Sequence, residues 1–187
     1  MARNGVRVIA GAYRGRVLAV PAVGTRPMTD RVRESVFSAL GHRCVDAHVL
    51  DAFAGSGVIG LEAASRGAAT VDFVESDRAA MQVLRANISK VAPDIPTRTH
   101  QLRIESFLAR SAQEPFDLAF FDPPFALEST ALATMLATSI DNGWWASDAT
   151  LVVERPREDP LTAPAGFHAD WERTFGGASI VMLRPAP

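Results

Sequence analysis

An alternation of apolar strand-like runs and helix-like segments between residues 48 and 154 restricts this chain to few folds. Segments with helical spacing separate the strand-type runs, which are 48–51, 70–74, 118–121 and 150–154. This rhythm implies a parallel sheet with helices on both faces. Two later β-type runs, near 168–175 and 179–184, meet at Gly176 and Gly177 and predict a closing antiparallel hairpin. The sequence therefore predicts an α/β fold whose ligands bind outside the carboxyl ends of the parallel strands.

A glycine-rich turn follows the first of these strands. Residues 49–62 read Val-Leu-Asp-Ala-Phe-Ala-Gly-Ser-Gly-Val-Ile-Gly-Leu-Glu, and the match to G-x-G-x-x-G is weak by itself. Gly55 and Gly57 permit positive φ and leave no Cβ between the backbone and a ligand. Asp51 precedes the turn, where it can accept a hydrogen bond from a cationic amino group, which a dinucleotide site does not need. The turn thus favours a ligand with an amino acid moiety over a tight turn without any ligand.

An acidic residue also ends the second predicted strand. Glu75 follows the glycine turn by about 20 residues, where α/β nucleotide sites place the carboxylate that binds the ribose hydroxyls. A carboxylate can accept hydrogen bonds from both the 2′ and the 3′ hydroxyl. Asp77 has a simpler interpretation, since Asp is a good N-cap for a helix beginning at Arg78. Glu75 is therefore the candidate ribose ligand.

Residues 120–125 read Phe-Phe-Asp-Pro-Pro-Phe and end the third strand of the series. The prolines cannot continue a hydrogen-bonded ladder, so Asp122 and Phe125 should stand at the mouth of the strand. The Asp122 carboxylate and the Pro123 carbonyl are acceptors, and Phe125 offers a face for stacking. This set suits a planar heterocycle that carries an exocyclic amino group. The alternative is a plain Pro-Pro turn with Asp122 as a turn former.

Together these motifs resemble the class I, Rossmann-like S-adenosylmethionine-dependent methyltransferases. Two arginine-rich segments, Arg7-Val-Ile-Ala-Gly-Ala-Tyr-Arg-Gly-Arg and Arg26-Pro-Met-Thr-Asp-Arg-Val-Arg-Glu, resemble the RsmD family, which methylates N2 of guanine 966 in 16S rRNA. The resemblance implies catalytic roles for Asp122, Pro123, Pro124 and Phe125. It also implies that the cofactor S-adenosylmethionine is bound by Thr29, Asp51, Phe53, Gly55, Gly57, Glu75, Ser76 and Ile104.

One position departs from the family pattern. The family usually has an acidic residue near the adenine of the cofactor, and this chain has Arg103 where that residue is expected. Ile104 remains available to pack on the adenine, and Glu105 is a nearby acceptor. The contacts of the adenine are therefore left open by the sequence.

Positive charge is concentrated near the N-terminus. Residues 1–50 contain eight arginines and three acidic residues and carry +5, although the whole chain carries −2. This placement is the expected footprint of phosphate contact with RNA. We expect an RNA-binding extension over residues 1–28, a β-hairpin turning near Gly15, followed by the methyltransferase domain at 29–187. The arginines expected to contact 16S rRNA of the small ribosomal subunit are Arg3, Arg7, Arg14, Arg16 and Arg26.

Composition favours a single enzyme domain that folds without a partner, since 48% of the 187 residues are apolar and 21% are charged. No apolar run is long enough to span a membrane, and no signal segment begins the chain, so we expect a cytoplasmic monomer. Cys44 is the single cysteine, and the four histidines lack ligand spacing, so we expect no metal site.

Other function classes stay open at this stage. An adenine-N6 DNA or RNA methyltransferase would use the same acceptors around its amine. An NAD-dependent oxidoreductase would explain the glycines and Glu75, but it gives Asp122 and its neighbours no task. A non-catalytic RNA-binding module would explain the arginines alone. Trp144 and Trp145 could frame the pocket, although packing is the commoner role of such a pair.

Overall fold

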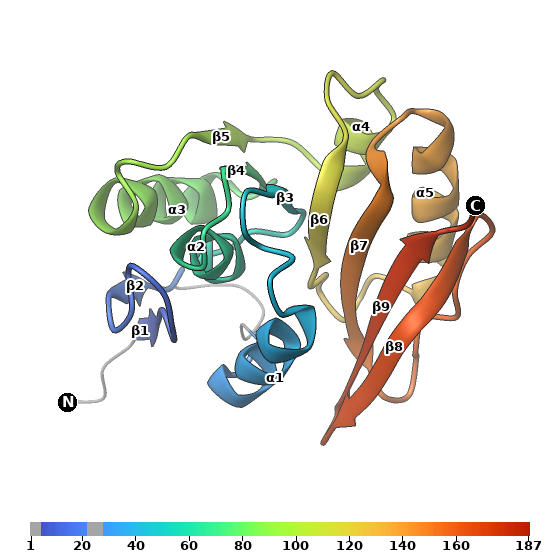
Figure 1. Ribbon diagram of the computed structural model, residues 1–187, viewed down its shortest axis with the longest axis horizontal. Coiled ribbons are helices and arrows are strands. Elements are labelled where there is room, and N and C mark those ends of the chain that lie inside the picture. The colour runs from blue at the N-terminus through green and yellow to red at the C-terminus, as the bar shows by residue number, and fades with distance from the viewer. Residues whose placement is uncertain (1–4, 22–27) are drawn as a thin grey trace.

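The computed structural model describes residues 5–21 and 28–187, and its main feature is a seven-stranded sheet (Figure 1). The strands of this sheet are β3 (His48–Asp51), β4 (Thr70–Val74), β5 (Thr97–His100), β6 (Phe116–Phe121), β7 (Trp145–Pro156), β8 (Phe167–Phe175) and β9 (Ala178–Pro185). The helices are α1 (Asp30–Leu40), α2 (Val58–Ser65), α3 (Arg78–Val91), α4 (Ile104–Leu108) and α5 (Ser129–Asp141). The predicted alternation of strand and helix is confirmed.

The strand order is β5-β4-β3-β6-β7-β9-β8. Strands β3 to β7 are parallel to their neighbours among themselves, whereas β9 pairs antiparallel with β7 and with β8. The chain builds outward from β3 through β4 to β5 and then returns to place β6 on the other side of β3. The carboxyl ends of β3 and β6 therefore flank the switch point of the sheet, which is where open α/β sheets bind ligands.

Each face of the sheet has its own core, because successive strand residues point to opposite sides. Phe120 packs with Phe37 of α1 at a ring distance of 5.3 Å, in a core shared with α2 and α3. The next residue, Phe121, packs on the other face with Trp145 in the core shared with α4 and α5. Trp144 stacks on Phe116 in that second core, so the packing interpretation of the Trp pair is confirmed.

Helix α1 begins where its sequence predicts. The Thr29 hydroxyl accepts a hydrogen bond from the Val32 N–H at 3.4 Å, which satisfies one of the free amides of the first turn. The predicted apolar stripe is buried and consists of Val32, Val36, Phe37 and Leu40. Arg33 is also fully buried, which the charge pattern did not predict. Its guanidinium donates to Asp30 and to the Arg7 carbonyl, so this arginine fixes the start of α1 to the N-terminal segment.

The N-terminal hairpin pairs only at its ends, β1 (Gly5–Arg7) with β2 (Val17–Ala19), and a turn fills the residues between them. Glu62 of α2 is completely buried and accepts hydrogen bonds from the N–H groups of Ile9 and Ala10, at 2.6 and 3.1 Å. Asn87 of α3 exchanges two hydrogen bonds with the backbone of Ala19 in β2. The hairpin is therefore docked against α2 and α3 by buried polar side chains (Figure 1).

Cys44 is buried, and burial raises the pKa of its thiol to about 11, which agrees with a packing role. Within residues 5–21 and 28–187, no helix has the length and apolar character needed to cross a membrane.

Candidate active site

A cavity of about 560 Å³ opens at the carboxyl ends of β3, β4 and β6, where the sequence places its motifs. It takes its walls from the glycine turn, from the residues after β4 and β5, and from the loop after β6. The lining residues are Val20, Pro21, Ala52, Phe53, Gly55, Ser56, Val74, Glu75, Ser76, Asp77, Ala80, Leu102, Arg103, Ile104, Glu105, Asp122, Pro124 and Leu127. The structure thus brings together predicted cofactor and catalytic residues from segments far apart in the sequence.

The two glycines of the turn serve different purposes. Gly55 has φ of 51°, and a Cβ built on it meets no atom within 4 Å, so its missing side chain leaves the cavity open. Gly57 has φ of 79°, and its Cβ would lie 2.3 Å from Leu84 Cδ1 of α3. Gly57 is therefore needed for packing rather than for space around a ligand, and it does not line the cavity. Sequence spacing alone could not separate these two roles.

Glu75 stands at the cavity wall directly after β4. One carboxylate oxygen accepts the Gly55 N–H at 2.9 Å, and the other accepts the Asp77 N–H at 2.7 Å. Each oxygen keeps a further lone pair for a ligand hydroxyl. Asp77 caps α3 through the Ala80 N–H, as predicted from its position. Glu75 is thus held in place from both sides and directed at the cavity.

Asp51 is less available than the sequence suggests. Its carboxylate accepts the Gly60 N–H of α2 at 2.9 Å, its exposed fraction is 2%, and it is absent from the cavity wall. Burial raises the pKa of Asp51 to about 7, against the lowering effect of the Gly60 hydrogen bond, and the nearby Asp122 and Glu75 raise it further. Its direct contact is with the helix that follows the glycine turn.

β6 ends at Phe121, so Asp122 and Phe125 follow the end of the strand, as the prolines predict. Asp122 lines the cavity beside Pro124, while Pro123 is buried. Burial raises the pKa of Asp122 to about 6, and a hydrogen bond from the Met28 backbone lowers it. Phe125 is 66% exposed, the largest exposed fraction among the big apolar side chains described. An exposed aromatic ring next to a cavity carboxylate leaves a stacking face for an incoming base.

A buried arginine fixes the far end of this loop. Arg155 of β7 donates to the Ser129 hydroxyl at 2.7 Å, to the Asp159 carboxylate at 2.7 Å and to the Leu127 carbonyl. Leu127 lines the cavity, so Arg155 holds the loop after β6 against the sheet. This role could not be predicted from the sequence, because arginine is usually exposed.

Arg103 and Glu105 form an ion pair at the rim of the cavity. Arg103 Nη2 lies 2.8 Å from Glu105 Oε1, and a second hydrogen bond joins Nε to the other oxygen at 3.3 Å. Ile104 is buried between them and lines the cavity, as expected for a residue that packs on an adenine. The positive charge of Arg103, the residue that departs from the family pattern, is thus paired with the negative charge of Glu105.

Comparison with known proteins agrees with this geometry. A family model described as Conserved hypothetical protein 95 matches residues 6–184. Ribosomal RNA small subunit methyltransferase D of Escherichia coli (strain K12) is 42% identical over 173 residues, covering 91% of this chain and 85% of that protein. The Haemophilus influenzae protein of the same name is 36% identical and covers 98% and 95%. The chain belongs to this family, the RsmD family.

Solved structures give the same answer for the RsmD fold. The solved structure of "Putative methyltransferase yhhF" from Escherichia coli has a TM-score of 0.86 at 40% identity, and the match covers 97% of this chain and 98% of that one. TrmN from Thermus thermophilus, at 20% identity and a TM-score of 0.68, shares the fold. The predictions of a Rossmann-like methyltransferase fold and of an enzyme are confirmed.

The arginines expected to bind RNA in this RsmD-family chain differ in whether their side chains already have partners within the protein. Arg16 donates to the Val91 carbonyl at the end of α3 and lies over the Tyr13 ring at 4.9 Å, so part of its role is to dock the hairpin. Arg7 is 68% exposed in its side chain and pairs with Asp30 at 3.2 Å. Arg14 is exposed, and its side chain forms no hydrogen bond or ion pair with any of the described residues. Arg3 and Arg26 lie outside the described residues.

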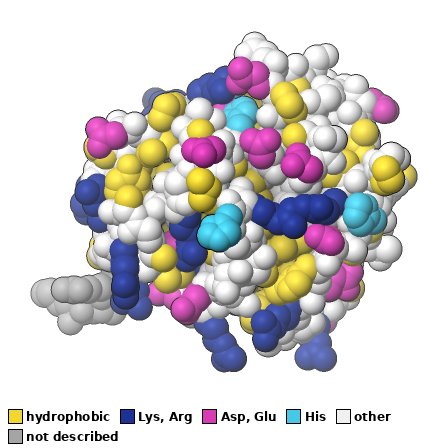
Figure 2. Space-filling view, in the orientation of Figure 1, with side chains coloured by type: hydrophobic (Ala, Val, Ile, Leu, Met, Phe, Trp, Pro, Cys, Tyr) yellow, Lys and Arg dark blue, Asp and Glu magenta, His cyan; other side chains and the backbone are white. Residues whose placement is uncertain are grey.

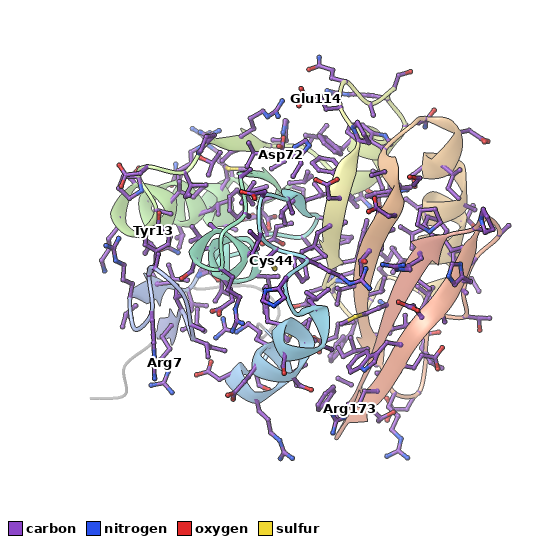
Figure 3. The ribbon with its side chains drawn as sticks, in the orientation of Figure 1. Arg7, Tyr13, Cys44, Asp72, Glu114 and Arg173 are labelled. Carbon is purple, nitrogen blue, oxygen red and sulfur yellow. The ribbon has the colours of Figure 1, made fainter. Side chains whose placement is uncertain are left out.

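Basic side chains are spread over the face shown in Figure 2, and several of them project from one edge of the molecule. In Figure 2 they project from the lower edge, which is the edge where α1 lies in Figure 1. Figure 3 shows Arg7 and Arg173 along this edge, one from the N-terminal hairpin and one from β8. The carboxyl ends of β6 and β7 point toward the same edge (Figure 1). This part of the positive charge and the predicted catalytic motif therefore face the same side.

Sequence reasoning missed two carboxylates. Glu62 is the one charge in the apolar run of α2, and an isolated charge of that kind signals a buried partner. Glu154 directly follows the apolar run Leu151 to Val153, as Asp51, Glu75 and Asp122 follow apolar runs of their own, although β7 itself continues to Pro156. The same rule that found those three residues applies to Glu154. No set of three or more His, Cys, Asp or Glu side chains suited to a metal ion occurs in the part of the chain that the structure describes.

Proposed function

We propose that this enzyme transfers a methyl group from S-adenosylmethionine to the exocyclic N2 of a guanine in the 16S rRNA of the small ribosomal subunit. The observation that carries the proposal is the position of Asp122 and exposed Phe125 beside a cavity bounded by Gly55 and Glu75. The names of the relatives, which are rRNA small subunit methyltransferases, support the substrate class.

The residues of the cavity fit S-adenosylmethionine. Gly55 leaves room for backbone contact with the ligand, and Glu75 offers two acceptor oxygens for the ribose hydroxyls. Ile104 and Phe53 supply apolar surface for the adenine. When bound, this cofactor supplies an electrophilic methyl group on a sulfonium. The buried Asp51 would act mainly by fixing α2 behind the glycine turn rather than by holding the amino group itself.

The chain's own contribution to the reaction is to orient the amine. The guanine amine is a poor nucleophile because its lone pair is delocalised into the ring. The Asp122 carboxylate and the Pro123 carbonyl would accept its two N–H groups and direct the lone pair toward the methyl group. Phe125 would stack on a base that has left its helical context. Holding both reactants in line would supply much of the rate.

Labelled S-adenosylmethionine tests this proposal. The enzyme is incubated with small subunits that lack the modification, with naked 16S rRNA and with double-stranded DNA, and the methylated nucleotide is mapped. We expect N2-methylguanine at one position of 16S rRNA. Label in the N6 of adenine, or label in DNA alone, would contradict the proposal and favour the adenine-N6 alternative.

A further inference from the structure

Glu154 lies beside the catalytic Asp122 on the neighbouring strand. In the parallel pairing of β6 with β7, Phe120 lies opposite Val152 and Phe121 opposite Val153. Glu154 is the next residue of β7, and Asp122 directly follows β6, which ends at Phe121. Because side chains alternate along a strand, Glu154 points to the face of Val152, which α1 covers, and the same alternation carried one residue past β6 places Asp122 on that face. Neighbouring strands lie about 4.8 Å apart, so the two carboxyl groups are adjacent.

One oxygen of Glu154 has no hydrogen-bond partner. Oε2 is inaccessible to solvent and finds no donor among the described residues. A buried carboxylate oxygen without a donor is costly, whereas a protonated carboxyl group can itself donate to an acceptor. Burial and the charge of Asp122 raise the pKa of Glu154 to about 8, so near neutral pH this group holds its proton. Two adjacent carboxyl groups commonly share one proton in this way.

Among the charged groups near this pair, Asp122 is the one available to accept a hydrogen bond from Glu154. The residue of β9 that pairs with Glu154 is Ile180, which is apolar. Ile180 pairs in turn with Arg173 of β8, whose guanidinium donates a hydrogen bond to the Ser35 hydroxyl. On β3, Asp51 adds a further acid near Asp122 and already accepts the Gly60 N–H.

The cations nearest in sequence have other partners. Arg155 points to the opposite face of the sheet and bonds to Ser129 and Asp159. On α1, Arg33 and Asp30 bond to each other at 2.7 Å. Of the residues described, Asp122 is the one whose charge acts on Glu154.

We propose that Glu154 is a positioning residue, whose protonated carboxyl donates a hydrogen bond to the Asp122 carboxylate and holds it ionised and oriented toward the substrate amine. The inference rests on the proposed function, since it assigns Asp122 the role of acceptor for that amine. The active form of the enzyme then has one proton on the pair. In acid the pair gains a second proton and Asp122 can no longer accept, and in base the pair loses its one proton and Glu154 can no longer donate.

The first test is the pH profile of single-turnover methylation at saturating substrates. The wild type should give a bell-shaped profile. Glu154→Gln should keep a substantial part of the rate and lose the alkaline limb, because a carboxamide donates at every pH. Glu154→Ala should lose about tenfold or more in rate with little change in RNA affinity, as for one hydrogen bond used in the transition state. The exposed Glu158 is a matched control, and Glu158→Gln should follow the wild type.

The second test needs no substrate and so separates this inference from the proposed function. Carboxyl-carbon NMR follows the titration of Glu154 in the wild type and in Asp122→Asn, with the folded state checked by circular dichroism. We expect Glu154 to titrate far above the usual range for glutamate, and at a lower pH in the variant. A Glu154 that titrates near 4.5 would overturn the proposal. An alkaline limb that persists in the pH profile of Glu154→Gln would also overturn the proposal. A methylation rate of Glu154→Ala close to that of the wild type would do the same.

Discussion

Replacing Glu75 by alanine tests the cofactor site most directly. Both oxygens of Glu75 are fixed by backbone N–H groups, at 2.9 Å from Gly55 and 2.7 Å from Asp77. In the proposed complex each oxygen would also accept one ribose hydroxyl. A hydrogen bond to a charged group is worth about 1.5–3 kcal/mol, so the loss of two such bonds should weaken binding by roughly 3 kcal/mol or more. This corresponds to an increase in Kd of at least about 100-fold.

The measurement is calorimetric titration with S-adenosylmethionine and with its demethylated product. The matched control is Glu114→Ala, which removes the same charge from a side chain that is 67% exposed and lies far from Arg7 and Arg173 (Figure 3). We expect the control to bind both ligands as the wild type does. Thermal unfolding of Glu75→Ala shows whether the loss of its two backbone contacts has unfolded the site.

Two results would refute this reasoning. The first is a Kd for folded Glu75→Ala within about threefold of the wild type, which would mean that the carboxylate only shapes the turn. The second is tighter binding of NAD than of S-adenosylmethionine by the wild type. That result would favour the NAD-dependent oxidoreductase alternative for the glycine turn, an alternative that gives Asp122 no role.

Three further predictions concern the chemistry, the RNA contact and the stability. Asp122→Ala should lose almost all of its single-turnover rate at saturating RNA while staying folded, and a rate near that of the wild type would remove it from catalysis. Arg14→Ala should weaken RNA binding and reduce the salt dependence of its affinity by about one counterion, with cofactor affinity unchanged, and an unaltered salt slope would contradict the assignment. Asp72→Asn should lower the free energy of unfolding at pH 7 by about 2 kcal/mol. Burial raises the pKa of Asp72, but hydrogen bonds from His100 and His48, together with the charge of Arg98, outweigh burial and lower it to about 2. Its stabilisation is therefore present above pH 4 and lost as the pH falls toward 2, so urea unfolding of wild type and variant should converge in acid.

Local pattern was sufficient to predict most of the secondary structure. The caps Thr29 and Asp77, the strand ends at Asp51 and Phe121, and the closing hairpin all follow from periodicity and turn chemistry. These signals depend on neighbours in the sequence. The meeting of Glu75 and Asp122 at one cavity also followed, because carboxyl ends of parallel strands share one edge of the sheet.

The sequence could not show which polar groups are used inside the protein. Asp51 has the position of a ligand residue, yet its carboxylate is bonded to Gly60 nine positions later, and only the placement of α2 reveals this. Arg33 belongs to the basic N-terminal segment but is buried under it. Charge patterns predict where arginines are concentrated, whereas partners distant in the chain decide which of them remain free for RNA.

Asn87 links the N-terminal hairpin to the glycine turn beside the cavity. Its side chain is buried on α3 and donates to the Ser56 carbonyl in the glycine turn at 2.9 Å. The same amide exchanges two hydrogen bonds with Ala19 in β2, one residue before the chain enters the cavity wall at Val20. On the other side of the site, the Met28 backbone bonds to Asp122 directly before α1 begins. Ala19 and Met28 are therefore both anchored to residues that border the proposed cofactor and amine sites. A buried amide with three hydrogen bonds has little freedom to move, so the hairpin is held rigidly against the glycine turn. RNA phosphates bound by the hairpin would then lie at a fixed distance from the methyl group. A fixed distance is what an enzyme needs in order to methylate one nucleotide among many.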